Sequence, residues 1–185
     1  MDGPHKSIVL IGMMGAGKSS VGGCLQQRTK LALVDTDDIV AAKFGMSICE
    51  IFSKYGEQAF RDAETQALRE LTPAKQTIIV TGGGIVLREA NRDLLRWLGV
   101  IVWLKGNEQT LFERASRAGT RPLLQLPNPR EAFSQLLHAR LPLYAKVAQI
   151  RVDTSMLTDE EVAVAILSKL GKHGRNMEAG FIDAG

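Results

Sequence analysis

The hydrophobic positions of the chain form short apolar runs, separated by longer segments with helical periodicity. Five of the runs are rich in β-branched residues and lack the apolar–polar alternation of a half-exposed strand. This pattern predicts strands that are buried on both faces of a parallel sheet. The predicted strands are Ser7–Ile11, Leu31–Val34, Thr77–Thr81, Val100–Leu104 and Gln149–Val152. Strands that alternate with helices predict a three-layer, doubly wound α/β fold with a parallel five-stranded sheet.

Three of the predicted helices begin with the spacing of a capping box, in which an N-terminal hydroxyl or amide side chain and a glutamate cap each other. Pro129 also suits the first position of a helix. The three pairs are Ser47 and Glu50, Asn128 and Glu131, and Thr158 and Glu161.

Two segments are longer or less regular than a simple crossover requires. Residues 36–75 are divided by Gly45 and Gly56, which predicts about three helices in this insertion. Residues 116–127 are polar and rich in glycine, proline and arginine, a composition typical of a mobile lid over a site.

Length and composition limit the class of protein. A chain of 185 residues fits one domain, which we expect over residues 1–171. After Gly171 the periodicity is lost, so residues 172–185 are predicted to form a flexible tail. The apolar run near the N-terminus is too short for a membrane span and leads directly into a lysine, which is wrong for a secretory signal.

Charge and cysteine content point to a cytoplasmic protein with a small ligand. The 23 basic and 20 acidic residues give a net charge of +3, which suits an anionic ligand but is weak support for nucleic acid binding. Cys24 and Cys49 are too few for a disulfide framework or a zinc cluster, and small buried thiols are the simpler interpretation.

The segment from Gly12 to Ser19 has the pattern G-x-x-x-x-G-K-S between a strand and a helix. Glycines let the loop curl so that its N–H groups converge on phosphate oxygens, and the following helix adds its positive end. Lys18 then reaches the β- and γ-phosphates, and the Ser19 hydroxyl ligates Mg²⁺. A turn that binds nothing is the alternative, but the position and the intact Gly-Lys-Ser favour a nucleoside triphosphate. The predicted nucleotide-binding residues here are Gly12, Gly15, Ala16, Gly17, Lys18, Ser19 and Ser20.

Two further clusters follow the predicted second and third strands. Asp35, Asp37 and Asp38 come at the end of one strand, and Gly82–Gly84 at the end of the next. Because the carboxyl ends of parallel strands face the ligand crevice, both clusters are predicted to lie beside the phosphate loop. The acids could equally serve as a helix cap and first-turn charges, and the glycines as a tight turn.

Arg61, Arg121 and Arg140 lie in helical or lid segments. Taken singly, each has the simpler interpretation of a surface residue, and Arg61 with Glu64 has the spacing of an intrahelical ion pair. Taken together and in order, the motifs resemble the shikimate kinase family, which are small P-loop enzymes of the nucleoside monophosphate kinase fold. The resemblance extends from about Ser7 to Leu170. Its motifs are the phosphate loop, Asp35-Thr36-Asp37, Gly45-Met46-Ser47-Ile48 with Glu50-Ile51-Phe52, Gly56-Glu57, Phe60-Arg61 with Glu64, Gly82-Gly83-Gly84, Thr120-Arg121-Pro122-Leu123-Leu124 and Arg140-Leu141-Pro142-Leu143-Tyr144.

The resemblance implies a role for each charged group near the substrate. Arg61 and Arg140 would grip the shikimate carboxylate, for which planar guanidinium groups are well suited. Asp37 would hold the substrate hydroxyls and orient or deprotonate the attacking one. Asp35 would help to hold Mg²⁺ through water, as Ser19 would directly.

It also implies that the insertion of residues 36–75 binds the substrate, and it gives roles to the surrounding residues. Glycines 82–84 would line the shikimate pocket with their amides, and Glu64 would support Arg61. Arg121 would close with the lid and stabilise the transferring phosphoryl group, while Arg114 would pack near the adenine. Small departures from the family pattern occur at Ser20, at Val40 and in residues 156–159, where a proline of some members is lacking; the adenine contacts there are the weakest part of the resemblance.

The resemblance therefore predicts a kinase that uses ATP and Mg²⁺ to convert shikimate into shikimate 3-phosphate. We expect a cytoplasmic monomer with no nucleic acid or membrane partner. A gluconate or nucleotide kinase is the alternative among enzymes, and the arginine pair and triple glycine argue against it. A regulatory nucleotide-binding module without catalysis is the alternative from another class, and the intact Lys18, Ser19, Asp37 and Arg121 argue against that.

Overall fold

The computed structural model of the protein describes residues 7–71, 75–117 and 127–182. Its strands are β1 (Ser7–Ile11), β2 (Ala32–Asp35), β3 (Thr77–Val80), β4 (Gly99–Lys105) and β5 (Ile150–Asp153). Its helices are α1 (Lys18–Thr29), α2 (Thr36–Phe44), α3 (Ile48–Glu70), the 3₁₀ turn η1 (Ile85–Leu87), α4 (Glu89–Leu98), α5 (Glu108–Arg117), α6 (Pro129–Val147) and α7 (Asp159–Ile182). Each predicted strand is present, with ends that differ by no more than one residue.

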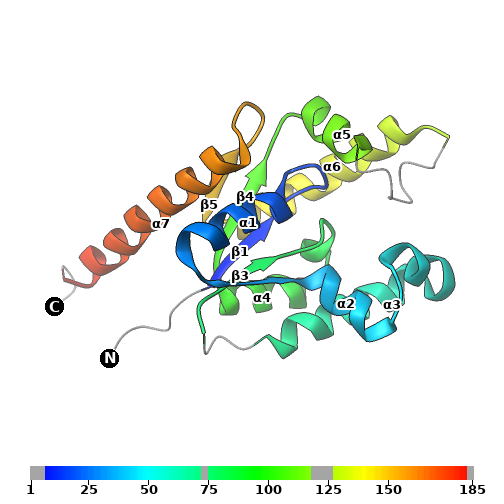
Figure 1. The fold of residues 1–185 in the computed structure, drawn as a ribbon, viewed down its shortest axis with the longest axis horizontal. Helices are drawn as coiled ribbons and strands as arrows, with labels where there is room; N and C mark the ends of the chain where they lie inside the picture. Colours follow the sequence, from blue (N-terminus) through cyan, green and yellow to red (C-terminus); the bar gives the residue numbers. More distant parts are fainter. Residues whose placement is uncertain (1–6, 72–74, 118–126, 183–185) are drawn as a thin grey trace.

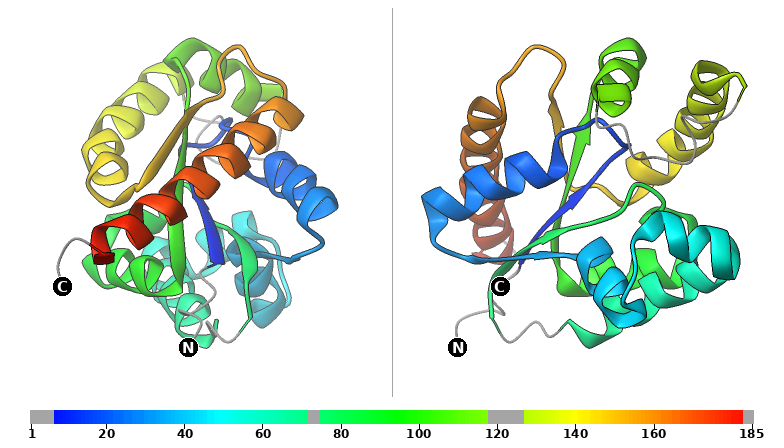
Figure 2. Two further views of the ribbon diagram at one scale, coloured as in Figure 1. Left: turned by 90° about the vertical axis from the view of Figure 1, so that its left-hand side faces the viewer. Right: turned by 45° about the vertical axis from the view of Figure 1, so that its right-hand side comes forward.

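The strands form one parallel sheet in the order β2-β3-β1-β4-β5. Leu10 of β1 pairs with Val80 on one side and Val102 on the other, so β1 lies at the centre. Helices α1 and α7 pack together on one side of the strands and α6 lies on the other (Figures 1 and 2). The predicted three-layer α/β fold is therefore confirmed.

Burial along the strands follows their position in the sheet. All five residues of β1 are buried, whereas β5 at one edge alternates between buried and exposed positions. The central strands are covered on both faces by helices, and an edge strand is covered on only one. The prediction of burial on both faces is therefore confirmed for β1 and wrong for β5, because an edge strand is covered on only one face.

The insertion after β2 forms a small unit with its own apolar cluster, centred on Val40, Ile51 and Phe60. Gly45 ends α2 in the left-handed conformation, and Gly56 breaks α3 with φ 80° and ψ 172°. The expected division of this segment by Gly45 and Gly56 is therefore present, although α3 continues on both sides of its break.

The helix starts follow the sequence with one exception. Ser47 with Glu50 and Thr158 with Glu161 form the reciprocal hydrogen bonds of a capping box. Asn128 precedes α6, but its side chain makes no capping hydrogen bond, so this predicted capping box was wrong. Its backbone has φ −124° and ψ 72°, outside the extended conformation that a capping residue normally adopts.

The end of the chain also differs from the prediction. Helix α7 continues through Gly171 to Ile182, so the loss of regular structure expected from residue 172 is not present in the described part. A glycine within a helix costs only about 1 kcal/mol relative to alanine, which the neighbouring helix-forming residues can offset. Among the described residues, no helix is long and apolar enough to cross a bilayer.

Candidate functional site

A cavity of about 710 Å³ opens at the carboxyl ends of β1, β2 and β3. The strand ends, the start of α1 and the loop before α7 supply its wall, so residues far apart in the sequence meet there. The lining residues are Gly15, Gly17, Lys18, Ser19, Ser20, Asp35, Asp37, Val80, Thr81, Gly82, Gly83, Arg114, Ala115, Leu157, Thr158 and Asp159.

The loop between β1 and α1 has the geometry of a phosphate-binding loop. Gly15 and Gly17 have φ near +80°, a conformation that L side chains rarely adopt. At Gly15, a Cβ would also collide with the carbonyl oxygen of Leu111. Lys18 begins α1, and its Nζ donates to the carbonyl oxygens of Gly12 at 2.9 Å and Met13 at 3.1 Å. The loop thus places a lysine and the positive end of a helix at the cavity.

Asp35 lies opposite the phosphate loop. Its Oδ1 accepts a hydrogen bond from the N–H of Asp37 at 2.9 Å and so caps α2, and its Oδ2 accepts one from the Ser19 hydroxyl at 3.5 Å. Burial, aided by the charges of Asp37 and Asp38, raises the pKa of Asp35 from 3.8 to about 6. The capping interpretation and the ligand interpretation of this residue therefore both have a structural basis.

This raised pKa leads to a prediction about stability. Because the folded-state pKa lies above 3.8, folding favours the protonated carboxyl, and stability is lost as pH rises from about 4 through 6. Asp35→Asn keeps a capping side chain and removes the charge. We expect its melting temperature to exceed that of the wild type at pH 7.5 by roughly 2–6 °C, from a gain of about 1–2 kcal/mol, since solvent screens part of the effect at a partly exposed carboxyl. At pH 4 the two should melt together; an equal difference at both pH values would contradict the assignment to this carboxyl.

Asp37 and Glu64 converge on the first glycine after β3. A Cβ on Gly82 would lie 2.7 Å from Asp37 Oδ1 and 2.9 Å from Glu64 Oε1, so only glycine fits between the carboxylates. Glu64 is fully buried, and its burial raises its pKa although the Arg61 guanidinium favours the ionised form. Two acids from separate helices therefore meet at the cavity wall.

Arg61 is held on both sides by carboxylates from its own helix. Its Nη1 donates to Glu64 Oε2 at 2.5 Å, and its Nη2 lies 3.1 Å from Glu57 Oε1. The contact between Glu64 and Arg61 that the family resemblance implied is therefore present. A Cβ on Gly84 would collide with the same guanidinium, so the glycine turn and Arg61 are in close contact.

Arg140 is also buried, but unlike Arg61 it has no carboxylate in contact with it among the described residues. Its side chain is 7% exposed, its Nη1 lies 3.9 Å from Met13 Sδ, and its Nε has no hydrogen-bond partner. Within the part of the chain that the structure describes, no carboxylate oxygen lies within ion-pair distance of it. A buried cation that no carboxylate contacts directly is costly, which makes this position suited to an anionic ligand.

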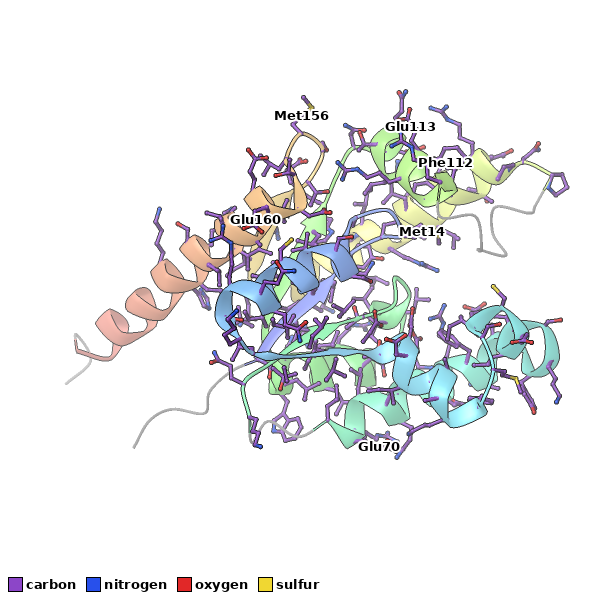
Figure 3. All side chains as sticks on the ribbon, in the orientation of Figure 1. Met14, Glu70, Phe112, Glu113, Met156 and Glu160 are labelled. Carbon is purple, nitrogen blue, oxygen red and sulfur yellow. The ribbon has the colours of Figure 1, made fainter. Side chains whose placement is uncertain are left out.

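At the opposite end of the cavity, Arg114 donates to the backbone oxygen of Thr154 at 3.0 Å and to its hydroxyl at 3.4 Å. Leu157, Thr158 and Asp159 line the same end, and they belong to the loop in which the family resemblance gave the least certain adenine contacts. Figure 3 shows Met156 at the tip of this loop, and Glu160 beside α1, where it pairs with Arg28.

The structure brings the predicted site residues together, except for Arg121, which it does not describe. The phosphate loop, Asp35, Asp37, Arg61, the triple glycine, Arg114 and Arg140 surround or adjoin the cavity. Arg121 and most of the expected lid lie outside the described residues. Cys24 and Cys49 lie on α1 and α3, and neither forms a disulfide among the described residues.

The chain is similar to known proteins over most of its length. A family model described as "Shikimate kinase" matches residues 14–171. A shikimate kinase of Thermodesulfovibrio yellowstonii is 46% identical over 164 residues, which cover 89% of this chain and 94% of the relative. A solved structure of shikimate kinase from Acinetobacter baumannii in complex with shikimate superimposes with a TM-score of 0.86 and 36% identity, covering 91% of this chain and 94% of that chain.

A gluconokinase of Sinorhizobium meliloti has a TM-score of 0.57 at 19% identity, covering 98% of this chain and 99% of that chain, and so shares only the fold. The family model and the relatives match nearly the whole chain, and the cavity has the phosphate-binding loop expected of a kinase. The chain therefore belongs to the shikimate kinase family, whose members are ATP-dependent kinases.

Proposed function

We propose that this protein transfers the γ-phosphoryl group of ATP to the 3-hydroxyl of shikimate, forming ADP and shikimate 3-phosphate. The reaction serves the synthesis of chorismate and aromatic amino acids. The observation that carries the proposal is the buried Arg140 guanidinium, which lacks a carboxylate partner among the described residues and lies beside the triple glycine. A planar carboxylate would supply the missing charge and accept two hydrogen bonds.

The two ends of the cavity suit the two substrates. Lys18 and the amides of the phosphate loop would hold the triphosphate, and Arg114 would lie along the adenine. Arg61 and Arg140 would hold the shikimate carboxylate, which leaves the hydroxyls toward Asp37. Phosphoryl transfer needs little covalent help, so positioning and charge neutralisation supply most of the rate.

Asp37 would act on the attacking hydroxyl. It comes at the start of α2 with one carboxylate oxygen at Gly82, between the phosphate loop and Glu64. In that place it would orient the hydroxyl and accept its proton as the oxygen attacks. Arg121, with the lid, would stabilise the transferring group and exclude water that would otherwise hydrolyse ATP.

The residues present fit Mg²⁺ as the metal. The structure places the Ser19 hydroxyl and an Asp35 oxygen 3.5 Å apart at the cavity wall, and oxygen ligands are those that Mg²⁺ prefers. The other ligands of Mg²⁺ would come from phosphate oxygens and water. When bound, Mg²⁺ would neutralise charge on the β- and γ-phosphates.

The proposal extends to the location, the oligomeric state and the partners of the protein. We propose a cytoplasmic monomer that acts on a small molecule, without nucleic acid or a membrane; the modest net charge of +3 supports a small anionic ligand rather than nucleic acid. Gel filtration with light scattering tests the monomer, and an elution at twice the expected mass would contradict it.

The experiment that tests the function measures ADP release from ATP and Mg²⁺ in the presence of shikimate, gluconate and other hydroxy acids. We expect release only with shikimate, and a phosphorylated product by mass spectrometry. Turnover with gluconate in place of shikimate would overturn the proposal, and ADP release without any acceptor would show an ATPase.

A further prediction concerns Arg140. Arg140→Ala should raise the KM for shikimate about 10- to 150-fold, since a charge-assisted contact contributes about 1.5–3 kcal/mol, while the KM for ATP changes little. Arg96→Ala, which removes an exposed arginine from α4, is the matched control and should behave as the wild type. Equal weakening of both substrates would mean that Arg140 acts through the fold.

A further inference from the structure

The three carbonyl groups of the glycine turn 82–84 are all engaged by hydrogen bonds. The first and the third accept from the N–H groups of Ile85 at 3.2 Å and Leu87 at 3.0 Å, both within the 3₁₀ turn. The second accepts from a side chain instead: the Tyr144 hydroxyl donates to the oxygen of Gly83 at 2.5 Å. Tyr144 therefore supplies the donor for the one carbonyl group of this turn that accepts no hydrogen bond from a nearby backbone N–H group.

The N–H groups of the same turn are in the opposite situation. Among the described residues, none accepts a hydrogen bond from the amides of Gly82, Gly83 or Gly84. In a trans peptide the C=O and the N–H point in opposite directions. Holding the oxygen of Gly83 toward Tyr144 thus directs the N–H of Gly84 away from Tyr144.

The Gly83–Gly84 peptide lies next to the two arginines that are proposed to bind the substrate carboxylate. The Gly84 Cα lies against the Arg61 guanidinium, and a Cβ on Gly83 would lie 3.6 Å from Arg140 Nη1. Tyr144 itself follows Arg140 by one turn of α6. One hydroxyl thereby connects the glycine turn to the helix that carries the second arginine.

Tyr144 is well fixed for this task. Its side chain is fully buried, and its ring stacks on Trp103 of β4 with the centroids 5.8 Å apart. Burial raises the pKa of Tyr144 to about 12, so the hydroxyl stays protonated and remains a donor throughout the neutral range.

We propose that Tyr144 is a positioning residue for substrate binding, which orients the Gly83–Gly84 peptide so that the Gly84 amide and the Arg140 guanidinium together receive the substrate carboxylate. The inference rests on the proposed function for the identity of that substrate. It assigns to the tyrosine hydroxyl a task beyond filling the core.

Tyr144→Phe removes the hydroxyl and keeps the ring on Trp103. Without the hydroxyl, the peptide can turn and the Gly84 amide loses its fixed direction. We expect the KM for shikimate to rise about 5- to 10-fold, as for the loss of one hydrogen bond, while the KM for ATP and kcat change less than about twofold. A residue with only a structural role would lower the melting temperature without this difference between the two substrates. A folded Tyr144→Phe variant with an unchanged shikimate KM would overturn the proposal.

Tyr55→Phe is the matched control, because Tyr55 is the only other tyrosine of the chain and is exposed on α3. It should show wild-type values for both substrates. The wild type, assayed in parallel, separates this inference from the proposed function: if the wild type does not phosphorylate shikimate, the function fails. If it does and Tyr144→Phe matches it, only the positioning role fails.

If Tyr144→Phe does not fold, the unsubstituted protein provides the test by proton NMR. A hydroxyl that is buried and held by a short hydrogen bond should exchange slowly with water and give a downfield resonance. We expect this resonance to shift when shikimate is added and to stay in place when ATP is added. A resonance that shikimate does not move would contradict the coupling between Tyr144 and the carboxylate site.

Discussion

Lys18→Ala is expected to lower kcat at least about 100-fold at saturating ATP and shikimate, with the fold intact. Lys18 begins α1 at the cavity, and its ammonium is held by the carbonyls of Gly12 and Met13. In the proposed complex it would provide a positive charge to the phosphates, and this charge would matter most as negative charge moves between the phosphoryl oxygens in the transition state.

The measurement is ADP release under single-turnover and steady-state conditions, with circular dichroism and thermal melting to verify folding. Lys172→Ala removes the same charge from an exposed position of α7 and should turn over at the wild-type rate. Near-normal turnover of folded Lys18→Ala would mean that the phosphate loop is not where the nucleotide reacts.

Asp37→Asn is expected to lower kcat about 10²- to 10⁴-fold, the usual contribution of a general base, while the KM for shikimate changes by no more than about threefold. Asparagine keeps the shape of the side chain and part of its hydrogen bonding, but it cannot accept the hydroxyl proton. An interaction that matters only as the hydroxyl attacks affects the rate and leaves substrate binding largely intact.

Asp38→Asn is the matched control, since Asp38 is the next residue of α2 and its side chain is exposed. It should retain the wild-type rate. A third variant, Asp35→Asn, distinguishes the two cavity carboxylates. If Asp37→Asn were active while Asp35→Asn were inactive, the base and the metal-holding residue would have exchanged roles.

Parts of the fold and of the candidate site could be predicted from short stretches of sequence. The phosphate loop could be predicted because its glycines, its lysine and the flanking strand and helix are contiguous, and each residue has a local physical reason. The same holds for Asp35 and Asp37, since the end of a buried parallel strand lies at the ligand crevice whatever the rest of the fold does. The capping box at Ser47 depends on only four residues.

Two errors show where local reasoning fails. Asn128 has the residue type and spacing of a capping residue, but its backbone conformation prevents the hydrogen bond. The chain beyond Gly171 has weak periodicity, yet α7 continues to Ile182 because propensity alone permits a helix there. In each case the pattern was compatible with two conformations of similar free energy.

The sequence alone predicted the parallel sheet, the phosphate loop and, through the family resemblance, the residues that would hold the substrate. Only the tertiary structure decided that Arg140 is buried without a carboxylate, that Asp37 and Glu64 leave room for nothing but glycine at Gly82, and that Tyr144 completes the glycine turn. Tyr144 and Gly83 are 61 positions apart, and Arg140 and Met13 are 127 apart. No periodicity or spacing relates such residues, because the packing of α6 against the strand ends is what brings them into contact.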